Sequence, residues 1–447
     1  MMKKIFFPLF CLITSVLYGQ EKVLSLSECI QTGLEKNYAL RIVRNQEEIS
    51  SNNHTLGNAG FLPTLDLQGA YNASLMDIKS KSVDGTTTSA NGVNNDGISA
   101  GLALNWTVFD GLRMQAAYVR LRELQQMGEL QTRLSIEELI ARIASGYNNH
   151  IYQSLRLKNM KASVDLSTER VRIVEARYQI GAASLLDLNQ ARVDLNTDLS
   201  NHISQKEVVS YSIVNLNRLL ANDEVEASFL LADSVINFNS LTDFESLRTN
   251  TLQSNTDILL AAKNVKLSEA DEKAIRSRYF PYLRLNAGYG YGLNRYETGS
   301  TKESQSLGFN YGVTVGINLF EGFNNRRELK NVRIEIENKE LLQQDIRLNL
   351  IATLSNLYLS YQNNQELRSM AKQNLVVARA YYEAAIDKYK LGSLSGLELR
   401  EAQQSLLNAE ERLLLAEYNI KLCEISLKQL SGDILSYLSK EQGNKIN

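Results

Sequence analysis

Residues whose types could support catalysis are few, and they do not gather into a catalytic set. Cys29 and Cys423 are too far apart in sequence for a CxxC motif or a metal-ligand cluster, although a single disulfide near the two chain ends stays open. The three histidines are scattered, at His54, His150 and His202. An enzyme needs a clustered nucleophile, an acid/base pair or a metal site. We therefore expect no catalytic activity and no cofactor.

Two kinds of binding site are also disfavoured by the sequence. Gly288, Gly290 and Gly292 superficially suggest a phosphate loop, but they alternate within a strand pattern and open no helix, so we expect no nucleotide site. The 48 Lys and Arg residues and 50 Asp and Glu residues are scattered and give a net charge of -2. Without a basic patch the chain is not expected to bind nucleic acid.

The N-terminus has the three parts of a secretory signal. Lys3 and Lys4 precede an apolar stretch over 5–16, and Gly19 offers a small residue before the cleavage site. We expect residues 1–19 to be a cleaved signal peptide, the alternative being a buried or uncleaved hydrophobic N-terminus. No cysteine follows the small-residue run of a lipidation site, so a lipid anchor is not expected. Charges interrupt every later apolar stretch, so membrane entry would have to use strands.

Three ordered matches show an internal duplication. The strand starts correspond at Phe61, Pro63, Leu65, Leu67 and Tyr71 and at Phe280, Pro281, Leu283, Leu285 and Tyr289. The strand ends correspond at Phe109-Asp110-Gly111 and Phe320-Glu321-Gly322. Two turns correspond at Tyr178, Gly181, Ser184, Asp187, Leu188 and Ala191 and at Tyr389, Gly392, Ser395, Glu398, Leu399 and Ala402. Each half then reads helix, strand, polar loop, strand, very long helix, tight turn, long helix. The predicted organisation is a first repeat over 20–221, a linker over 222–243, a second repeat over 244–431 and a tail over 432–447.

The strands alternate with period two, apolar against polar. We expect strand pairs at 61–76 with 98–109 and at 280–295 with 306–320, each pair joined by a polar loop, 77–96 and 295–306. Pro63 and Pro281 stand where a helical pattern gives way to this alternation. A half-buried soluble sheet is the alternative, but runs of ten or more residues rich in Tyr favour membrane strands. Leu285 and Val315 would then face lipid, and Asn286 and Thr314 the lumen.

Four strands cannot close a barrel by themselves. An open edge in lipid leaves backbone groups without partners, at several kcal/mol for each group, so closure requires several copies of the chain. Two, three or four copies would give eight, twelve or sixteen strands, and the residues alone do not choose among these numbers.

The helices are long for a globular domain. From about residue 112 to 178 and from about 326 to 389 there is no proline and little glycine, and apolar residues recur at helical spacing. About 65 residues at 1.5 Å rise make a helix about 100 Å long. A plain coiled coil is one interpretation. A helical wall with water on both sides is the other, and it also explains the polar residues along these helices.

The two turns carry a family resemblance. Residues 178–188 and 389–399 resemble the paired periplasmic turns of TolC-like outer-membrane efflux proteins, and the Phe-Asp-Gly and Phe-Glu-Gly strand ends resemble a second hallmark of that family. The likeness covers almost the whole mature chain. It implies a mixed α and β fold in which three protomers build a 12-stranded transmembrane β-barrel in the outer membrane and a 12-helix periplasmic tunnel.

The resemblance also implies a function and partners. A TolC-like duct docks on a periplasmic adaptor protein, which links it to an inner-membrane pump of the RND, ABC or MFS type, and conducts substrates passively to the exterior. The docking residues would be those of the two turns: Gly181, Ala182, Ala183, Ser184, Leu185 and Asp187, and Gly392, Ser393, Leu394, Ser395, Leu397 and Glu398. Turn architecture alone is the alternative role for them. Gly181 and Gly392 would end their helices with a positive φ, and Asp187 and Glu398 would complement the dipoles of the returning helices.

The resemblance further implies an acidic ring at the tunnel entrance. Glu383 matches the position of an acidic residue shortly before the second turn, and Asp387 lies one turn further on. Three copies would make a negative ring that favours cations or binds a divalent ion; a solvated helix face is the alternative.

Other classes of protein fit the whole pattern less well. An adhesin has no reason to carry matched barrel strands in both halves, and a periplasmic enzyme lacks its catalytic set.

Overall fold

The computed structural model describes residues 23–239 and 243–439, so the expected signal peptide lies outside the described residues. The chain forms two compact units, and the boundary between them falls within the two longest helices, Arg113–Gln179 and Asn324–Lys390. Of the described residues, one unit contains 23–38, 136–239, 243–250 and 353–439, and the other contains 39–135 and 251–352. Among the described helices, none is both long enough and apolar enough to cross a membrane.

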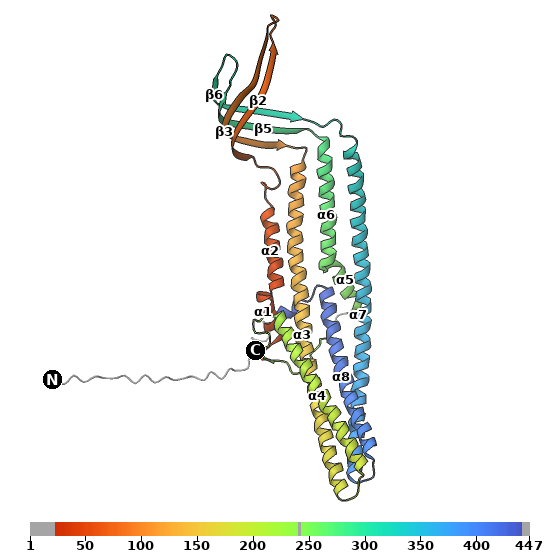
Figure 1. Cartoon of the computed structure of the whole chain (residues 1–447). Helices are drawn as coiled ribbons and strands as arrows, with labels where there is room; N and C mark the ends of the chain where they lie inside the picture. The colour runs from red at the N-terminus through yellow and green to blue at the C-terminus, as the bar shows by residue number, and fades with distance from the viewer. Residues whose placement is uncertain (1–22, 240–242, 440–447) are drawn as a thin grey trace, which may run out of the picture. The chain divides into compact units, whose positions relative to one another are not determined.

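The second unit carries one antiparallel four-stranded sheet in the order β2-β3-β5-β6 (Figure 1). Its strands are β2 (Thr64–Lys81), β3 (Thr87–Phe109), β5 (Tyr282–Arg295) and β6 (Glu303–Gly316). Neighbouring strands pair along nearly their whole length, with register shifts between Met76 and Ile78 and between Thr107 and Phe109. The two strand pairs predicted from the duplication are thus joined through β3 and β5.

The first polar loop was predicted too long. The alternation of apolar residues stops near Met76, but the strands continue to Lys81 and resume at Thr87, leaving only 82–86 as the turn. Backbone hydrogen bonds need no apolar side chains, so polar residues continue the ladder. The end of β6 was also predicted too late. Gly316 pairs with Tyr282, which follows Pro281, so residues 317–320 have no partner on β5.

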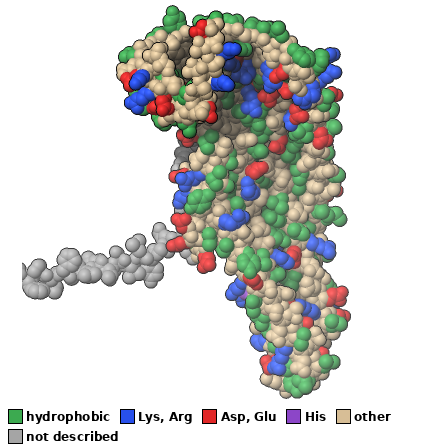
Figure 2. Space-filling model, turned by 45° about the horizontal axis from the view of Figure 1, so that its top comes forward, with side chains coloured by type: hydrophobic (Ala, Val, Ile, Leu, Met, Phe, Trp, Pro, Cys, Tyr) green, Lys and Arg blue, Asp and Glu red, His purple; other side chains and the backbone are tan. Residues whose placement is uncertain are grey.

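The register places the apolar residues of all four strands on one face. Leu67, Leu102, Tyr289 and Phe309 form one cross-strand row, and Leu285 lies between Trp106 and Val313 in another. Many of these side chains are exposed, for example Leu67 at 80% and Tyr311 at 79%. The opposite face carries Asn, Gly, Ser and Thr. In the space-filling view the sheet curls over a hollow, with hydrophobic side chains along its outer rim (Figure 2).

The long helices match their predicted ranges within about two residues. The helices are α1 (Leu26–Lys36), α2 (Tyr38–Asn53), α3 (Arg113–Gln179), α4 (Leu185–Leu219), α5 (Phe244–Ser254), α6 (Thr256–Arg276), α7 (Asn324–Lys390), α8 (Gly396–Leu430) and α9 (Ser436–Ser439). A short 3-10 turn (Ser277–Tyr279) precedes β5, and β1 (Val23–Leu24) pairs in parallel with β4 (Leu230–Leu231). In each half, a 67-residue helix is followed by a 35-residue helix.

The first unit is held together by small separate cores. One of them, built around Leu354 and Ile420, joins α5, α7 and α8. Cys423 lies in this core, and burial raises the pKa of its thiol. Cys29 is also buried, and the structure joins neither thiol in a disulfide. The single disulfide left open by the sequence is therefore not part of this fold.

Candidate functional site

The turns between α3 and α4 and between α7 and α8 share one backbone design. Gly181 has φ +74° and Gly392 has φ +81°, so both adopt the left-handed conformation that ends a helix without the steric strain that other residues would suffer. In the first turn the Ala182 amide donates to the Arg177 carbonyl over 2.7 Å. The Ser393 amide of the second turn makes the equivalent bond, at 3.0 Å. Both helices thus end in a Schellman motif, which confirms the predicted positive φ.

Each returning helix begins with a capping box. Asp187 accepts hydrogen bonds from the Ser184 amide and hydroxyl at 2.9 and 2.7 Å, while the Asp187 amide donates to the Ser184 hydroxyl. Ser395 and Glu398 repeat the arrangement at the start of α8. These serine hydrogen bonds lower the pKa of both carboxyl groups. The S-x-x-D/E spacing in both turns is the sequence signal for this motif.

A hydrophobic core packs the two hairpins together next to their turns. It contains residues from all four long helices: Val174, Leu188, Ala191, Ala385, Tyr389, Leu399 and Ala402. The Arg177 guanidinium of α3 lies over the Tyr389 ring of α7, 5.3 Å from its centroid, and donates to the Tyr389 carbonyl at 3.4 Å. Burial raises the pKa of the Tyr389 hydroxyl, against the influence of Arg177. The two turns therefore form one joined end of the first unit (Figure 1).

The structure separates the predicted turn residues into two groups. Ala183 and Leu394 are partly buried against the hydrophobic core, so they support the turns from within. The other predicted turn residues are exposed, among them Leu185 at 54% and Leu397 at 78%. Sequence reasoning missed three further exposed apolar residues: Ile180, Leu186 and Leu391. Ile180 and Leu391 could have been found because each directly precedes a turn glycine, and Leu186 because it directly follows the predicted Leu185.

The two predicted entrance acids lie on the exposed side of α7. Glu383 and Asp387 are one helical turn apart, and both side chains are exposed. Between them Ala385 packs into the core of the hairpins. The helix therefore presents the two carboxylates to solvent on the face opposite that core. Their role at an entrance stays a prediction.

Further along the hairpins, one carboxylate holds three helices together. Asp198 of α4 is 6% exposed and accepts hydrogen bonds from Arg400 of α8 at 2.8 and 2.9 Å, and from Ser167 of α3. The buried Gln403 amide also donates to Ser167. Burial alone would raise the pKa of Asp198, but the bonds from Arg400 and Ser167 lower it below its usual value.

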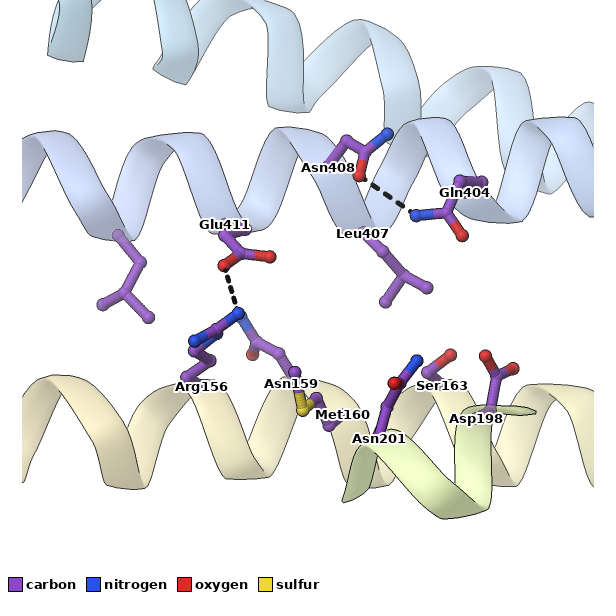
Figure 3. A pocket seen from close by; sticks show the side chains of 11 residues that line it. Arg156, Asn159, Met160, Ser163, Asp198, Asn201, Gln404, Leu407, Asn408 and Glu411 are labelled. Atoms are coloured by element: carbon purple, nitrogen blue, oxygen red, sulfur yellow. Dashed lines mark hydrogen bonds and ion pairs between the residues drawn. The ribbon is translucent and has the colours of Figure 1, made fainter. Parts of the chain in front are cut away.

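A polar pocket of about 260 Å³ adjoins this cluster (Figure 3). It lies between α3, α4 and α8, and Asp198, Asn201 and Ser163 line one end of it. At the other end Arg156 and Glu411 form an ion pair at 3.0 Å. Figure 3 shows Leu407 pointing from α8 toward α3 between these polar groups. Polar side chains thus fill part of the interface between hairpins, where a plain coiled coil would place apolar residues.

Comparison with known proteins agrees with this geometry. A family model described as outer membrane efflux protein matches residues 29–222 and 247–433. Over 362 residues the chain is 20% identical to the outer membrane protein TolC of Escherichia coli K12, covering 77% of this chain and 71% of that protein. It is 22% identical to the probable efflux pump outer membrane protein TtgC of Pseudomonas putida, covering 91% and 83%.

Solved structures share the fold. The outer-membrane channel OprN superposes with a TM-score of 0.76 at 17% identity, covering 91% of this chain and 90% of that one. The CmeC outer membrane channel of Campylobacter jejuni gives 0.74 at 17% identity, covering 94% and 90%. The chain belongs to the outer membrane efflux protein family. It is a TolC-like exit duct of the outer membrane, with its helical part in the periplasm.

Proposed function

We propose that three copies of this chain form the exit duct of a tripartite export system, docked at the helical end on a periplasmic adaptor. The observation that carries the proposal is the four-stranded sheet, which has one apolar exposed face and two strand edges, at β2 and β6. Unpaired edges are not tolerated in lipid, so neighbouring copies must pair β6 with β2. Twelve strands from three protomers close the barrel, and the long helices continue the channel.

The joined hairpin turns are the proposed adaptor-docking surface. The docking residues are Gly181, Ala182, Ser184, Leu185, Asp187, Gly392, Ser393, Ser395, Leu397 and Glu398, supported by Ala183 and Leu394 and extended by Ile180, Leu186 and Leu391. Large exposed apolar groups at such a site indicate a protein partner. Because each protomer has two similar turns, a trimer offers six quasi-equivalent docking positions.

The docking test uses proline substitutions in the turns. Gly181→Pro and Gly392→Pro each replace a residue with positive φ whose amide donates a hydrogen bond, so each turn must rearrange. Gly396→Pro is the matched control. Gly396 is the first residue of α8, where proline is tolerated, and the preceding Ser395 is extended at ψ 157°. Each variant is first checked for channel formation in a planar bilayer.

The loss of export and of adaptor crosslinking is expected to increase from the single variants to the double variant. A single Gly→Pro variant weakens export and crosslinking to the adaptor, the double variant abolishes both while still conducting ions, and Gly396→Pro behaves as the wild type. A double variant that crosslinks and exports normally shows that the adaptor binds the duct elsewhere. The energy for export is supplied by the partner pump, so channel formation itself requires no nucleotide.

A further inference from the structure

The two junctions between a strand and a long helix share one backbone conformation. Gly111 and Leu112, which precede α3, have φ +73° and +74°, and Gly322 and Phe323, which precede α7, have φ +60° and +62°. A positive φ is uncommon in residues other than glycine. Its occurrence at both Leu112 and Phe323, which are 211 positions apart like the rest of this part of the duplication, shows that the two repeats build the same junction.

The first junction packs against another part of the chain, whereas the second does not. A Cβ built on Gly111 would lie 2.3 Å from the Ser277 carbonyl oxygen and 2.8 Å from the Phe280 Cβ atom, so only glycine fits there. Beyond its immediate chain neighbours, a Cβ on Gly322 would have only the Asn324 amide nitrogen within 4 Å, at 3.7 Å. Gly111 is buried and Gly322 is exposed. Within the described chain, the second junction therefore lacks the neighbour that the first one has.

The strand ends that lead into the junctions differ in the same way. β3 pairs with β5 as far as Phe109, which lies opposite Leu283. β6 pairs only with β5 and only as far as Gly316, so among the described residues no strand lies beside the corresponding stretch, 317–320. All four side chains of this stretch are exposed, Leu319 at 87%. An apolar strand end with a free edge is a template for pairing with another chain.

The duplication identifies the partner of this edge. The end of β3 at Phe109 corresponds to Phe320, 211 positions later, and Leu283 of β5 corresponds to Leu65 of β2, 218 positions earlier. The second repeat thus ends in the counterpart of β3, and the counterpart of its neighbour β5 is β2. Within the sheet β2 is the other edge strand. Only the β2 of another copy can therefore take the place beside β6 that β5 takes beside β3.

Resting on the proposed function, in which neighbouring copies pair β6 with β2, we propose that this seam repeats the register of β3 with β5. The pairing of Trp106 with Leu285 then has its counterpart in Ile317 opposite Leu67 of the neighbouring copy. Phe320 lies opposite Leu65 of the neighbouring copy in the same way. The stretch 317–320, which has no partner in its own chain, is thereby paired by a second copy.

The apolar pattern of the two edge strands agrees with this register. Further along the seam, Val313 comes opposite Tyr71 of the neighbouring copy, and Phe309 opposite Leu75 of the neighbouring copy. All four belong to the apolar face of their own strands and are exposed in the single chain, Leu75 at 75%. A slip by one residue would place each apolar side chain opposite a residue of the polar face. The seam therefore continues the apolar face of the sheet without interruption from one copy to the next.

The test is disulfide crosslinking of the full-length protein in the outer membrane. Ile317→Cys combined with Leu67→Cys should give covalent dimers and trimers on a denaturing gel after oxidation, since directly opposed side chains have Cβ atoms about 5 Å apart. Val315→Cys with Leu67→Cys is the matched control, because this pair lies on the same face but is diagonal, at about 7 to 8 Å. Each single variant shows whether the native thiols contribute, and heat-stable trimers are measured for every variant.

A trimer in which the control pair crosslinks and Ile317→Cys with Leu67→Cys does not, or in which neither pair crosslinks, overturns the inferred register and leaves the proposed duct in place. If the first double variant does not accumulate, Val313→Cys with Tyr71→Cys tests the same register at a second level: a covalent trimer supports the inference, and its absence overturns it. A wild-type protein that forms no trimer instead contradicts the proposed function, and the seam with it.

Discussion

An arginine on the apolar face of the sheet should prevent stable insertion, whereas an arginine one residue away should be tolerated. Leu285 lies between Trp106 and Val313 on the apolar face, and Asn286 follows it on the polar face. The apolar alternation begins at Leu307 on β6 and continues to Leu319, three residues beyond the end of the strand at Gly316, so its midpoint is Val313. At about 3.4 Å per residue and a tilt of about 45°, each end is about 14 Å from the midplane.

Leu285 therefore lies close to the centre of the membrane. Arg there should cost about 2 to 4 kcal/mol, and Val315→Arg somewhat less, because Val315 is nearer an interface. Asn286→Arg faces the lumen and should cost about 1 kcal/mol or less. Thr314 is a poorer control, because it pairs with Arg284 and a second arginine would add like-charge repulsion.

The assay is the amount of heat-stable trimer in the outer-membrane fraction, together with the urea midpoint of the purified protein. A difference of 2 kcal/mol corresponds to a folding equilibrium about 30-fold lower for Leu285→Arg than for Asn286→Arg. Equal losses in the two variants would refute the assignment of the faces, or the membrane barrel itself.

Two further predictions concern charged groups of the helices. Replacing Glu383 and Asp387 together with Ala should raise conductance or weaken block by divalent cations while leaving trimers intact, because both side chains are exposed; unchanged conductance and block would show that they form no gate. Asp198→Asn should remove at most about 3 kcal/mol of stability, since it leaves the partly buried Arg400 without its charged partner. Because folding lowers the pKa of Asp198, its contribution is complete above the unfolded pKa of about 3.9 and is lost as pH falls through the folded value. The unfolding temperatures of the wild type and of Asp198→Asn should therefore approach each other as the pH falls below about 3.9. A difference in unfolding temperature that stays constant down to about pH 3 would contradict this account.

The sequence predicted the elements that have a strong period. Proline and strict alternation located the sheet, and the absence of proline over 112–178 predicted α3 nearly to the residue. The polar hairpin ladder up to Lys81 was missed, because backbone pairing leaves no apolar pattern when both faces contact water. The alternation of apolar and polar residues arises from burial of one face, so it gives no signal for a strand segment with no buried face.

The sequence predicted the positions of the two turns and the conformation of their glycines, but it did not predict the side-chain contacts that join them. The positive φ of Gly181 follows from residue type alone, whereas the contact between Arg177 and Tyr389 joins residues more than two hundred positions apart and has no local signal. The same holds for Asp198 and Arg400. Likewise, the pairing of Asn286 with Gly312 becomes visible only once the register is known, because a one-residue slip would bring Asn286 opposite another residue.

The central claim is that this chain is a passive channel, and the most direct test is single-channel recording of the purified wild-type protein in a planar bilayer without nucleotide. The account predicts discrete conductance steps from a heat-stable trimer. A folded trimer that inserts into the bilayer and carries no current, under both polarities and after removal of divalent cations, would contradict it.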